Sequence, residues 1–207
     1  MPRPSRWDEI VRAAAHVFQE KGYDGASLED IAERVGIWKG SLYHYITSKQ
    51  DLLLAVVEPI ADELLEQTRA LQADATLTAP DKLRRVAAVH SAIIATNFNY
   101  VAVYLQEVAG RRRSTDWDQR DHEYVLLIAD IIVEGVEAGD FAPDLDPHVA
   151  SLAFLGSLNW MTRWYQPRRD SSAQEVARTI TNVLLAGMLS RSAAADQPAA
   201  DVSRERA

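Results

Sequence analysis

The sequence predicts an all-α protein of about nine helices, with no segment assigned to a strand. Apolar residues recur every three or four positions through most of the chain from Trp7 to Met188, which is the period of an α-helix. Four Ser-x-x-Asp or Ser-x-x-Glu motifs start at Ser5, Ser27, Ser48 and Ser172. Such motifs satisfy the free amides at a helix start, so each is expected to open a helix.

Composition narrows the class of protein. The chain has 207 residues and 47% hydrophobic content, enough for one or two domains with a core. It has no cysteine, which excludes disulfides, thiolate metal sites and a cysteine nucleophile. No apolar run is long enough to cross a membrane, and the N-terminus lacks the apolar segment of a signal peptide. We therefore expect a cytoplasmic protein without membrane association.

The first three helices are expected to be short and closely linked. The first should run from about residue 6 to 21, where Gly22 ends it in the left-handed conformation. The second follows Ser27 and stops at Gly36. Only residues 35–37 then separate it from the third helix, so the two must cross steeply. This is helix-turn-helix geometry, with the third helix presented outward.

Two different faces are predicted for this third helix. At 100° per residue, Leu42 and Ile46 point one way and pack, whereas Lys39, Tyr43 and His44 spread over the opposite arc. The stretch from Arg34 to Lys49 holds three basic residues, three aromatics and no acid. Residues 1–50 are neutral overall, so the whole net charge of -8 lies beyond them. A local cationic patch of this kind suits phosphate binding.

The remaining helices follow from apolar spacing and from loop residues. They are expected from Ser48 through Leu71, from 81 to 96, from about 100 to 110, and over 119–137, 147–165 and 173–189. Pro59 should kink the first of these without ending a domain. Residues 76–80, 97–99, 111–118 and 166–170 are expected to be irregular. Asp146 and Pro147 suit the start of a helix, and residues 191–207 form a disordered tail.

Five motifs match a known family pattern. They are Gly22-Tyr23, Ser27-Leu28-Glu29-Asp30-Ile31-Ala32, Val35-Gly36, Gly40-Ser41-Leu42-Tyr43-His44-Tyr45 and Ser48-Lys49-Gln50-Asp51-Leu52. With them, residues 1–52 resemble the TetR family of bacterial transcriptional repressors. Ile46 departs from the pattern, which usually has phenylalanine there.

The resemblance implies an organisation and a function. Residues 1–52 would be the DNA-binding domain and 53–190 the ligand-binding and dimerisation domain. A homodimer would place two recognition helices in successive major grooves of a near-palindromic operator, and a small-molecule effector would release it. The candidate DNA contacts are Ser27, Trp38, Lys39, Gly40, Ser41, Tyr43, His44 and Lys49. Trp38 lies close to Leu42 on the helical wheel, so packing is an equal alternative for it.

Two clusters are candidate effector contacts. The first holds Phe98, Tyr100, Tyr104 and Glu107, followed by a run of three arginines, and the second holds Trp160, Arg163 and Trp164. Residues 139–147 and 163–167 are similar to TetR regulators of lipid and sterol catabolism that respond to acyl-CoA thioesters. That similarity implies an acyl-CoA or another hydrophobic anion as effector. The alternative places the two tryptophans in the dimer interface. Arg163 would then compensate the helix C-terminus, and the three-arginine run would be a solvated loop.

Enzymatic function is not expected. The five histidines, at positions 16, 44, 90, 122 and 148, lack zinc-ligand spacing, and no nucleophile elbow, P-loop or dinucleotide fingerprint is present. We therefore expect no cofactor and no metal. The alternative function from another class is a helical ligand-binding or protein-interaction module without DNA readout. An activator of the same family is a further alternative to a repressor.

Overall fold

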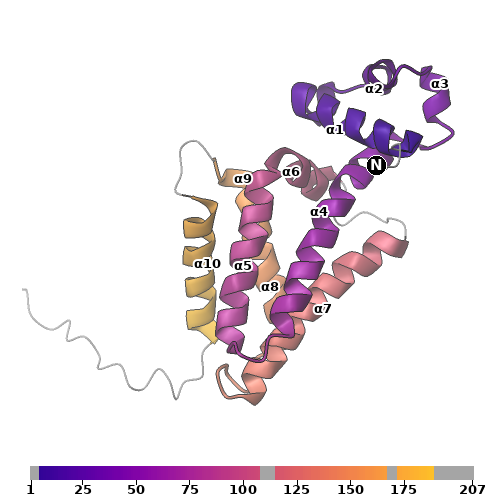
Figure 1. The fold of residues 1–207 in the computed structure, drawn as a ribbon. Coiled ribbons are helices and arrows are strands. Elements are labelled where there is room, and N and C mark those ends of the chain that lie inside the picture. Colours follow the sequence, from indigo (N-terminus) through magenta and orange to yellow (C-terminus); the bar gives the residue numbers. More distant parts are fainter. Residues whose placement is uncertain (1–4, 108–114, 167–171, 189–207) are drawn as a thin grey trace, which may run out of the picture.

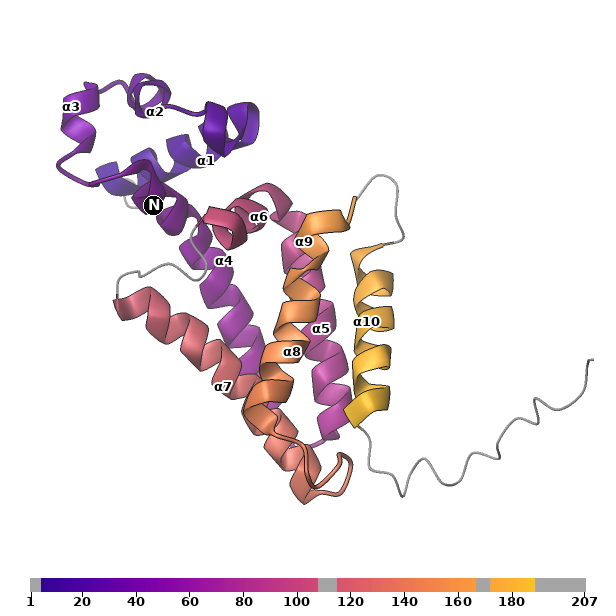
Figure 2. The same cartoon turned by 180° about the vertical axis from the view of Figure 1, so that it is seen from behind.

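The computed structural model describes residues 5–107, 115–166 and 172–188, and these form ten helices and no β-sheet (Figures 1 and 2). The helices are α1 (Arg6–Gly25), α2 (Leu28–Val35), α3 (Lys39–Leu42), α4 (Lys49–Gln72), α5 (Ala79–Thr96), α6 (Phe98–Glu107), α7 (Thr115–Glu137), α8 (Pro147–Asn159), α9 (Met161–Trp164) and α10 (Ala173–Met188). The predicted all-α class is confirmed. The expected tail from residue 191 lies outside the described residues.

The helices form two lobes joined by one long helix. In Figure 1, α1, α2 and α3 make a small lobe, and α5, α7, α8 and α10 stand together in a larger one. Helix α4 starts in the small lobe and runs down into the larger lobe, passing through Pro59 without a break. Helices α6 and α9 lie at the end of the larger lobe that faces the small lobe (Figure 2).

Local caps set most helix starts as the sequence predicts. The hydroxyls of Ser5 and Ser27 each accept the amide N–H three residues on, at 3.2 Å. Ser172 accepts the Glu175 amide at 3.3 Å, and Asp146 accepts two amides at the start of α8. Gly36 ends α2 in the left-handed conformation (φ 72°, ψ 39°). These short-range bonds explain why the sequence alone locates the boundaries.

Several boundaries differ from the prediction. Helix α6 begins at Phe98, inside residues 97–99 that were expected to be irregular. Gly22 has a positive φ of 71°, but its ψ of 165° is extended, and one further helical turn follows it. Helix α5 begins at Ala79 because Thr78 caps it and Pro80 needs no hydrogen bond in the first turn. Helix α7 begins at Thr115, inside the segment expected to be irregular. Residues 108–114 lie outside the described part.

The segment 147–165 was expected to be one helix and is two. Helix α8 ends at Asn159 and α9 begins at Met161. At the break, the Thr162 hydroxyl donates to the Asn159 carbonyl at 2.8 Å, a side-chain bond that competes with the helical ladder. This interruption gives ten helices in the described residues instead of nine.

Each lobe has its own apolar core. Ile10, Phe18, Ile31 and Leu42 are at most 3% exposed in the core of the small lobe. The core of the larger lobe gathers buried side chains of α5, α7, α8 and α10. Tyr104 of α6 packs with the small-lobe core although its helix lies in the larger lobe. Helices α4 and α6 are therefore the physical links between the lobes.

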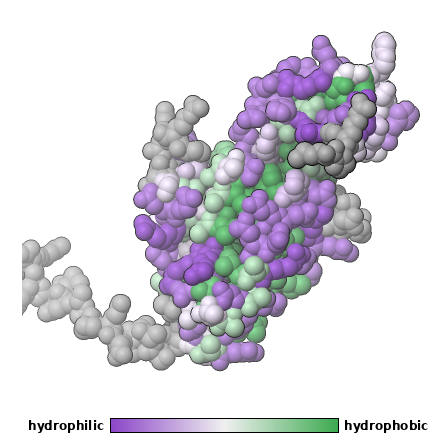
Figure 3. All heavy atoms as spheres, viewed as in Figure 1, coloured by the Kyte–Doolittle hydropathy of each residue, from purple (hydrophilic) through white to green (hydrophobic). Residues whose placement is uncertain are grey.

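The surface reflects the same division. Figure 3 shows mainly hydrophilic residues over the small lobe and patches of hydrophobic residues on the larger one. Across the described residues, no single helix combines the length and apolarity needed to cross a membrane. The pair α5 and α6 passes that test only when joined, and it bends by 100° between the two helices.

Candidate DNA-binding surface and effector cavity

The turn between α2 and α3 fixes the outward position of α3. Gly36 takes the left-handed conformation, and the Ile37 amide donates back to the Ala32 carbonyl at 3.0 Å. Trp38 is the residue immediately before α3. Leu42 and Ile46 are 0% and 4% exposed, so they anchor this segment to the core as the helical wheel predicts. The opposite face of α3 is left to solvent.

Most of the predicted DNA contacts lie on that free face. Trp38 is 87% exposed and Tyr43 is 52% exposed, and Lys39, Gly40 and His44 are also exposed. Ser41 is half-buried beside them. The packing alternative for Trp38 is wrong for the free chain, because almost none of its ring is covered. An exposed aromatic next to a lysine at the tip of the lobe suits contact with a nucleic acid.

Ion pairs hold the charged residues around this surface. Lys39 pairs with Glu29, Arg34 pairs with Glu20 at 2.6 Å, and all four side chains are substantially exposed. The hydrogen bond from Lys39 holds the pKa of Glu29 below its ordinary value. Exposed pairs of this kind contribute little to stability and are screened by salt. Lys39 can therefore exchange Glu29 for a phosphate or a base edge at small cost.

Ser27 and Lys49 both have structural partners in the free protein, and only those of Lys49 were not predicted from the sequence. Ser27 caps α2, and its hydroxyl also donates to Asp30 at 2.8 Å. The Lys49 ammonium donates to the carbonyls of Tyr23 and Ala26, at 2.6 and 3.0 Å, and lies 4.3 Å from the centroid of the Tyr23 ring. Lys49 thus ties the α1–α2 turn to the start of α4. Its partners are distant in the sequence, so no local motif indicates them.

A cavity of about 360 Å³ lies within the larger lobe, below the junction with the small lobe. Helices α4, α5, α6, α7 and α8 all contribute to its wall. Its apolar lining includes Val57, Ile60, Leu64, Leu65, Ile93, Val101, Leu105, Val125, Leu152 and Leu155. A mostly apolar cavity with a few polar groups is typical of a small-molecule site.

Three polar side chains on the cavity wall form a chain of hydrogen bonds. His90 of α5 lies 2.9 Å from the Tyr124 hydroxyl through Nδ1 and 3.0 Å from the Asn159 amide oxygen through Nε2. His90 is 4% exposed, and burial lowers its pKa to about 4. Burial also raises the pKa of Tyr124. The imidazole and the phenol are therefore both neutral at neutral pH.

The cavity wall that faces the small lobe carries charged side chains. Arg120 of α7 donates to Glu58 and Asp62 of α4, at 2.7 and 3.0 Å. Asp121 accepts the Tyr104 hydroxyl at 3.2 Å. These contacts join α4, α6 and α7 at the cavity wall. A ligand that shifts any of these helices would disturb the same contacts.

Among the predicted effector residues whose side chains the structure describes, only Tyr104 lines this cavity. Tyr100 instead donates its hydroxyl to the Ala15 carbonyl of α1 at 2.9 Å, and Phe98 packs against the larger-lobe core. The side chain of Glu107 and the three arginines lie outside the described residues. The sequence missed His90, Tyr124 and Asn159, because they come from three helices and form no local motif.

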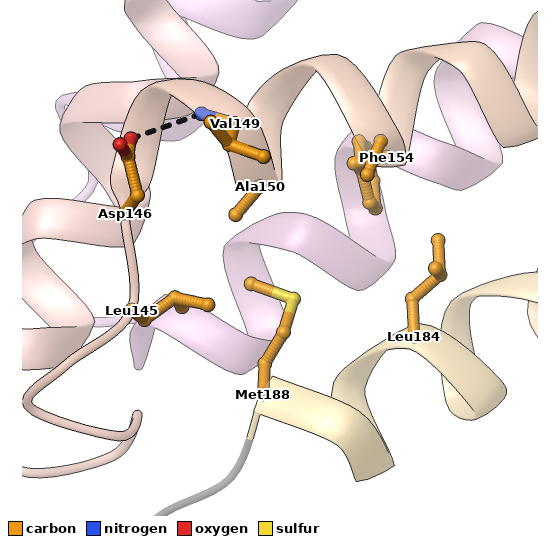
Figure 4. Close-up of a pocket in the computed structure, with 8 residues that line it drawn as sticks. Leu145, Asp146, Val149, Ala150, Phe154, Leu184 and Met188 are labelled. Carbon is orange, nitrogen blue, oxygen red and sulfur yellow. Dashed lines mark hydrogen bonds between the residues drawn. The ribbon is translucent and has the colours of Figure 1, made fainter.

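The second predicted cluster lies on another face. Trp160 and Trp164 line an open groove of about 630 Å³ between α8 and α10, and Arg163 is exposed beside it. A smaller hollow of about 250 Å³ lies at the other end of these helices, lined by Leu145, Val149, Phe154, Leu184 and Met188 (Figure 4). Val149 and Val183 are 60% and 70% exposed. The α8–α10 face is therefore apolar and uncovered in the single chain.

Metal chemistry finds no support in the described part of the chain, which contains no group of three or more histidine, aspartate or glutamate side chains arranged to hold an ion. The protein combines a helix-turn-helix that has an exposed recognition face, a separate apolar cavity, and helices that link the two. Together they define a ligand-responsive DNA-binding protein.

Comparison with known families gives the same class. Residues 10–56 match the family described as bacterial regulatory proteins, tetR family. Residues 76–188 match the family described as tetracyclin repressor-like, C-terminal domain. The chain belongs to the TetR family of DNA-binding transcriptional regulators, as the motifs between Gly22 and Leu52 suggested. Members of this family are dimers.

Several relatives align along nearly the whole chain. The transcriptional repressor KstR2 of Mycolicibacterium smegmatis is 32% identical over 192 residues, covering 89% of this chain and 91% of KstR2. The structure of the ketosteroid regulator KstR2 of Mycobacterium tuberculosis has a TM-score of 0.71 at 27% identity, covering 91% of this chain and 97% of that one. AibR, solved with isovaleryl coenzyme A and operator DNA, has a TM-score of 0.70 at 26% identity, covering 87% and 98%.

Proposed function

We propose that this regulator represses transcription by binding a near-palindromic operator as a homodimer, and that an acyl-CoA thioester releases it. The observation that carries the proposal is the apolar cavity, whose wall includes α4 and α6, the two helices that reach the small lobe. An acyl group that fills the cavity would act on the position of α3 through these helices.

On the DNA side, Trp38, Lys39, Ser41, Tyr43 and His44 contact the operator, with Gly40 allowing a close backbone approach. Their exposure on one face of α3 supports this assignment. Ser27 and Lys49 lie near helix starts at the edge of that face, where phosphates are favoured. The first role of Lys49 in the free protein is to tie Tyr23 and Ala26, so its phosphate contact would be secondary.

On the effector side, the apolar lining suits an acyl chain. AibR was solved with a coenzyme A thioester, which supports this class of ligand. About 360 Å³ can hold an acyl group but not the nucleotide of coenzyme A, so the nucleotide would lie outside the cavity. Tyr104 contacts the acyl group, and Phe98, Tyr100 and Glu107 belong to the helix that responds to it.

The α8–α10 face forms the dimer interface. Its exposed apolar side chains suit a four-helix contact with the same face of a second copy. Trp160 and Trp164 would be covered there, with Arg163 at the edge. This arrangement follows the alternative interpretation of the second cluster, in which the tryptophans pack between subunits.

The same proposal includes a division of the chain. Residues 1–52 bind DNA, 53–190 bind the effector and form the dimer, and 191–207 form a tail. The protein acts in the cytoplasm and carries no catalytic activity. The effector controls its occupancy of DNA and is not converted.

The test is selection of genomic fragments by the purified protein, followed by anisotropy titration of the enriched sequence. A near-palindrome should be recovered, and binding should weaken steeply with salt. Acyl-CoA thioesters of increasing chain length should then release the DNA, whereas free coenzyme A should not. Weak binding to every fragment at low salt would support the module without DNA readout instead.

A further inference from the structure

The inference concerns the polar end of the effector cavity, and it rests on the proposed function of that cavity. His90, Tyr124 and Asn159 approach one another from α5, α7 and α8. The rest of the wall is largely aliphatic. Of these three side chains His90 is buried, whereas Tyr124 and Asn159 are partly exposed. A ligand that fills the cavity covers them, which costs free energy unless their hydrogen bonds are completed.

The proton positions follow from the chemistry of the three groups. The His90 imidazole is neutral at neutral pH and carries a single N–H. The Asn159 amide oxygen can only accept, so Nε2 must carry that proton and donate across the 3.0 Å contact. Nδ1 is then bare and accepts the Tyr124 hydroxyl at 2.9 Å. Each hydrogen bond in the chain fixes the direction of the next.

This arrangement leaves the Asn159 amide nitrogen as a donor. Its oxygen is held by His90, so the two N–H groups on Nδ2 must point elsewhere, and Asn159 borders the cavity. Within the described residues, no protein acceptor lies within hydrogen-bond distance of Nδ2. His90 therefore acts as a positioning residue that presents an amide donor to the ligand.

The aliphatic wall selects a neutral acceptor. A carboxylate on the buried part of the ligand would lose its water, and a single amide donor does not offset the cost of removing that charge from water. A carbonyl oxygen accepts the same hydrogen bond without charge. The remaining aliphatic wall requires the rest of the buried ligand to be apolar.

We propose that Asn159, oriented by His90, is the specificity-determining donor of the cavity and binds a neutral carbonyl oxygen on an otherwise apolar effector. Two sources share this chemistry: the thioester carbonyl of an acyl-CoA, or a ketone on its acyl body. Asn159 is partly exposed in the free chain, and an amide donor that a bound ligand covers without accepting from it loses most of a hydrogen bond. The analogue without the carbonyl should therefore bind about tenfold more weakly.

The first experiment compares ligands that differ in one group, by isothermal titration calorimetry on the full-length dimer. Decanoyl-CoA against the thioether S-decyl-CoA tests the thioester carbonyl, and 9-oxodecanoyl-CoA against decanoyl-CoA tests a ketone on the acyl body. The wild type should prefer the carbonyl member of one pair about tenfold. The pair that shows the preference identifies the source.

The variant Asn159→Asp keeps an oxygen that accepts from His90, but its carboxylate has no N–H group to donate to the ligand. The preference for the ligand with the carbonyl should therefore disappear. Ser157→Ala, on the same helix but facing the outer groove, is the matched control and should retain it. Operator affinity and the thermal unfolding midpoint show that both variants are folded. Equal affinities within both pairs for the wild type, or an unchanged preference in Asn159→Asp, would overturn the proposal.

A second readout separates this proposal from the acyl-CoA proposal. Nonan-2-one labelled with ¹³C at its carbonyl lacks coenzyme A. In the wild type and Ser157→Ala, its bound resonance should stay near the position seen in water, because Asn159 replaces the hydrogen bond from water. In Asn159→Asp it should move upfield toward the position seen in hexane. If the bound ketone shows this upfield shift in Asn159→Asp but no CoA ligand binds, only the acyl-CoA proposal fails. Identical or undetectable bound resonances in wild type and Asn159→Asp would refute the role of Asn159.

Discussion

The small lobe and the larger lobe are each stabilised internally by a different kind of interaction. In the small lobe, the helix caps join residues close in sequence, such as Ser27 with Asp30, and the pairs between charged side chains are exposed. In the larger lobe, His90 contacts Asn159, which is distant in the sequence, and it does so in a buried, neutral form. The small lobe should therefore respond mainly to salt and to DNA, and the larger lobe to pH and to apolar ligands.

The largest expected effect is on the acid stability of the larger lobe. The pKa of His90 is about 4 in the folded protein, below its ordinary value of 6.5. The unfolded chain therefore binds the extra proton between these values, so His90 favours folding fully above pH 6.5 and progressively less as the pH falls to 4. The loss over that range is on the order of 3 kcal/mol.

Chemical denaturation of wild type and His90→Phe at pH 7 and pH 4 tests this, at one protein concentration. The variant should be less stable at pH 7, since Tyr124 and Asn159 lose a partner, but its stability should fall less on acidification. His44→Gln in the small lobe changes an exposed histidine and is the control. Parallel pH curves for wild type and His90→Phe would contradict the prediction.

The next effect tests packing at the base of the larger lobe. A methyl group on Gly135 would lie 2.3 Å from the Phe141 ring and 2.8 Å from the Ala79 side chain, and Phe141 is 1% exposed. Overpacking of this kind costs about 2 kcal/mol, so Gly135→Ala should lower the free energy of unfolding by that amount. Gly187→Ala, where a methyl group meets nothing within 4 Å, is the control. Equal stabilities of the two variants would show that Phe141 moves aside.

The sequence predicted the two lobes unequally, and the reason is physical. Local motifs predict the helix starts at Ser5 and Ser27 and the turn at Gly36, because each depends on residues within four positions. The cavity depends on which helix faces which, and that is decided by packing across the whole lobe. No local pattern distinguishes His90 from other histidines or Gly135 from other helical glycines, because their partners are distant in the sequence or lie in another element.

The third prediction contrasts two lysines of the small lobe. Within the described residues, the ion pair of Lys39 is an exposed one with Glu29. Lys39→Ala should therefore leave the fold intact, weaken operator binding about 10- to 100-fold and relax base preference. Lys49→Ala should weaken binding uniformly across sequences and also destabilise the lobe, because Tyr23 and Ala26 lose their shared donor. Anisotropy titrations on operator and scrambled DNA, with thermal unfolding, separate the two outcomes. Unchanged operator affinity in both variants would refute both assignments.

The smallest effect on stability is expected at Gly40, where the demands of the fold and of DNA binding differ. A methyl group there meets nothing within 4 Å in the free protein, and alanine is favoured over glycine in a helix by up to about 1 kcal/mol. Gly40→Ala should therefore unfold at the same or a slightly higher temperature. Operator affinity should nevertheless fall, because the added methyl group occupies the space through which the α3 backbone approaches DNA. If both stability and affinity are unchanged, the DNA does not approach α3 at Gly40, and recognition depends on the longer side chains of this face alone.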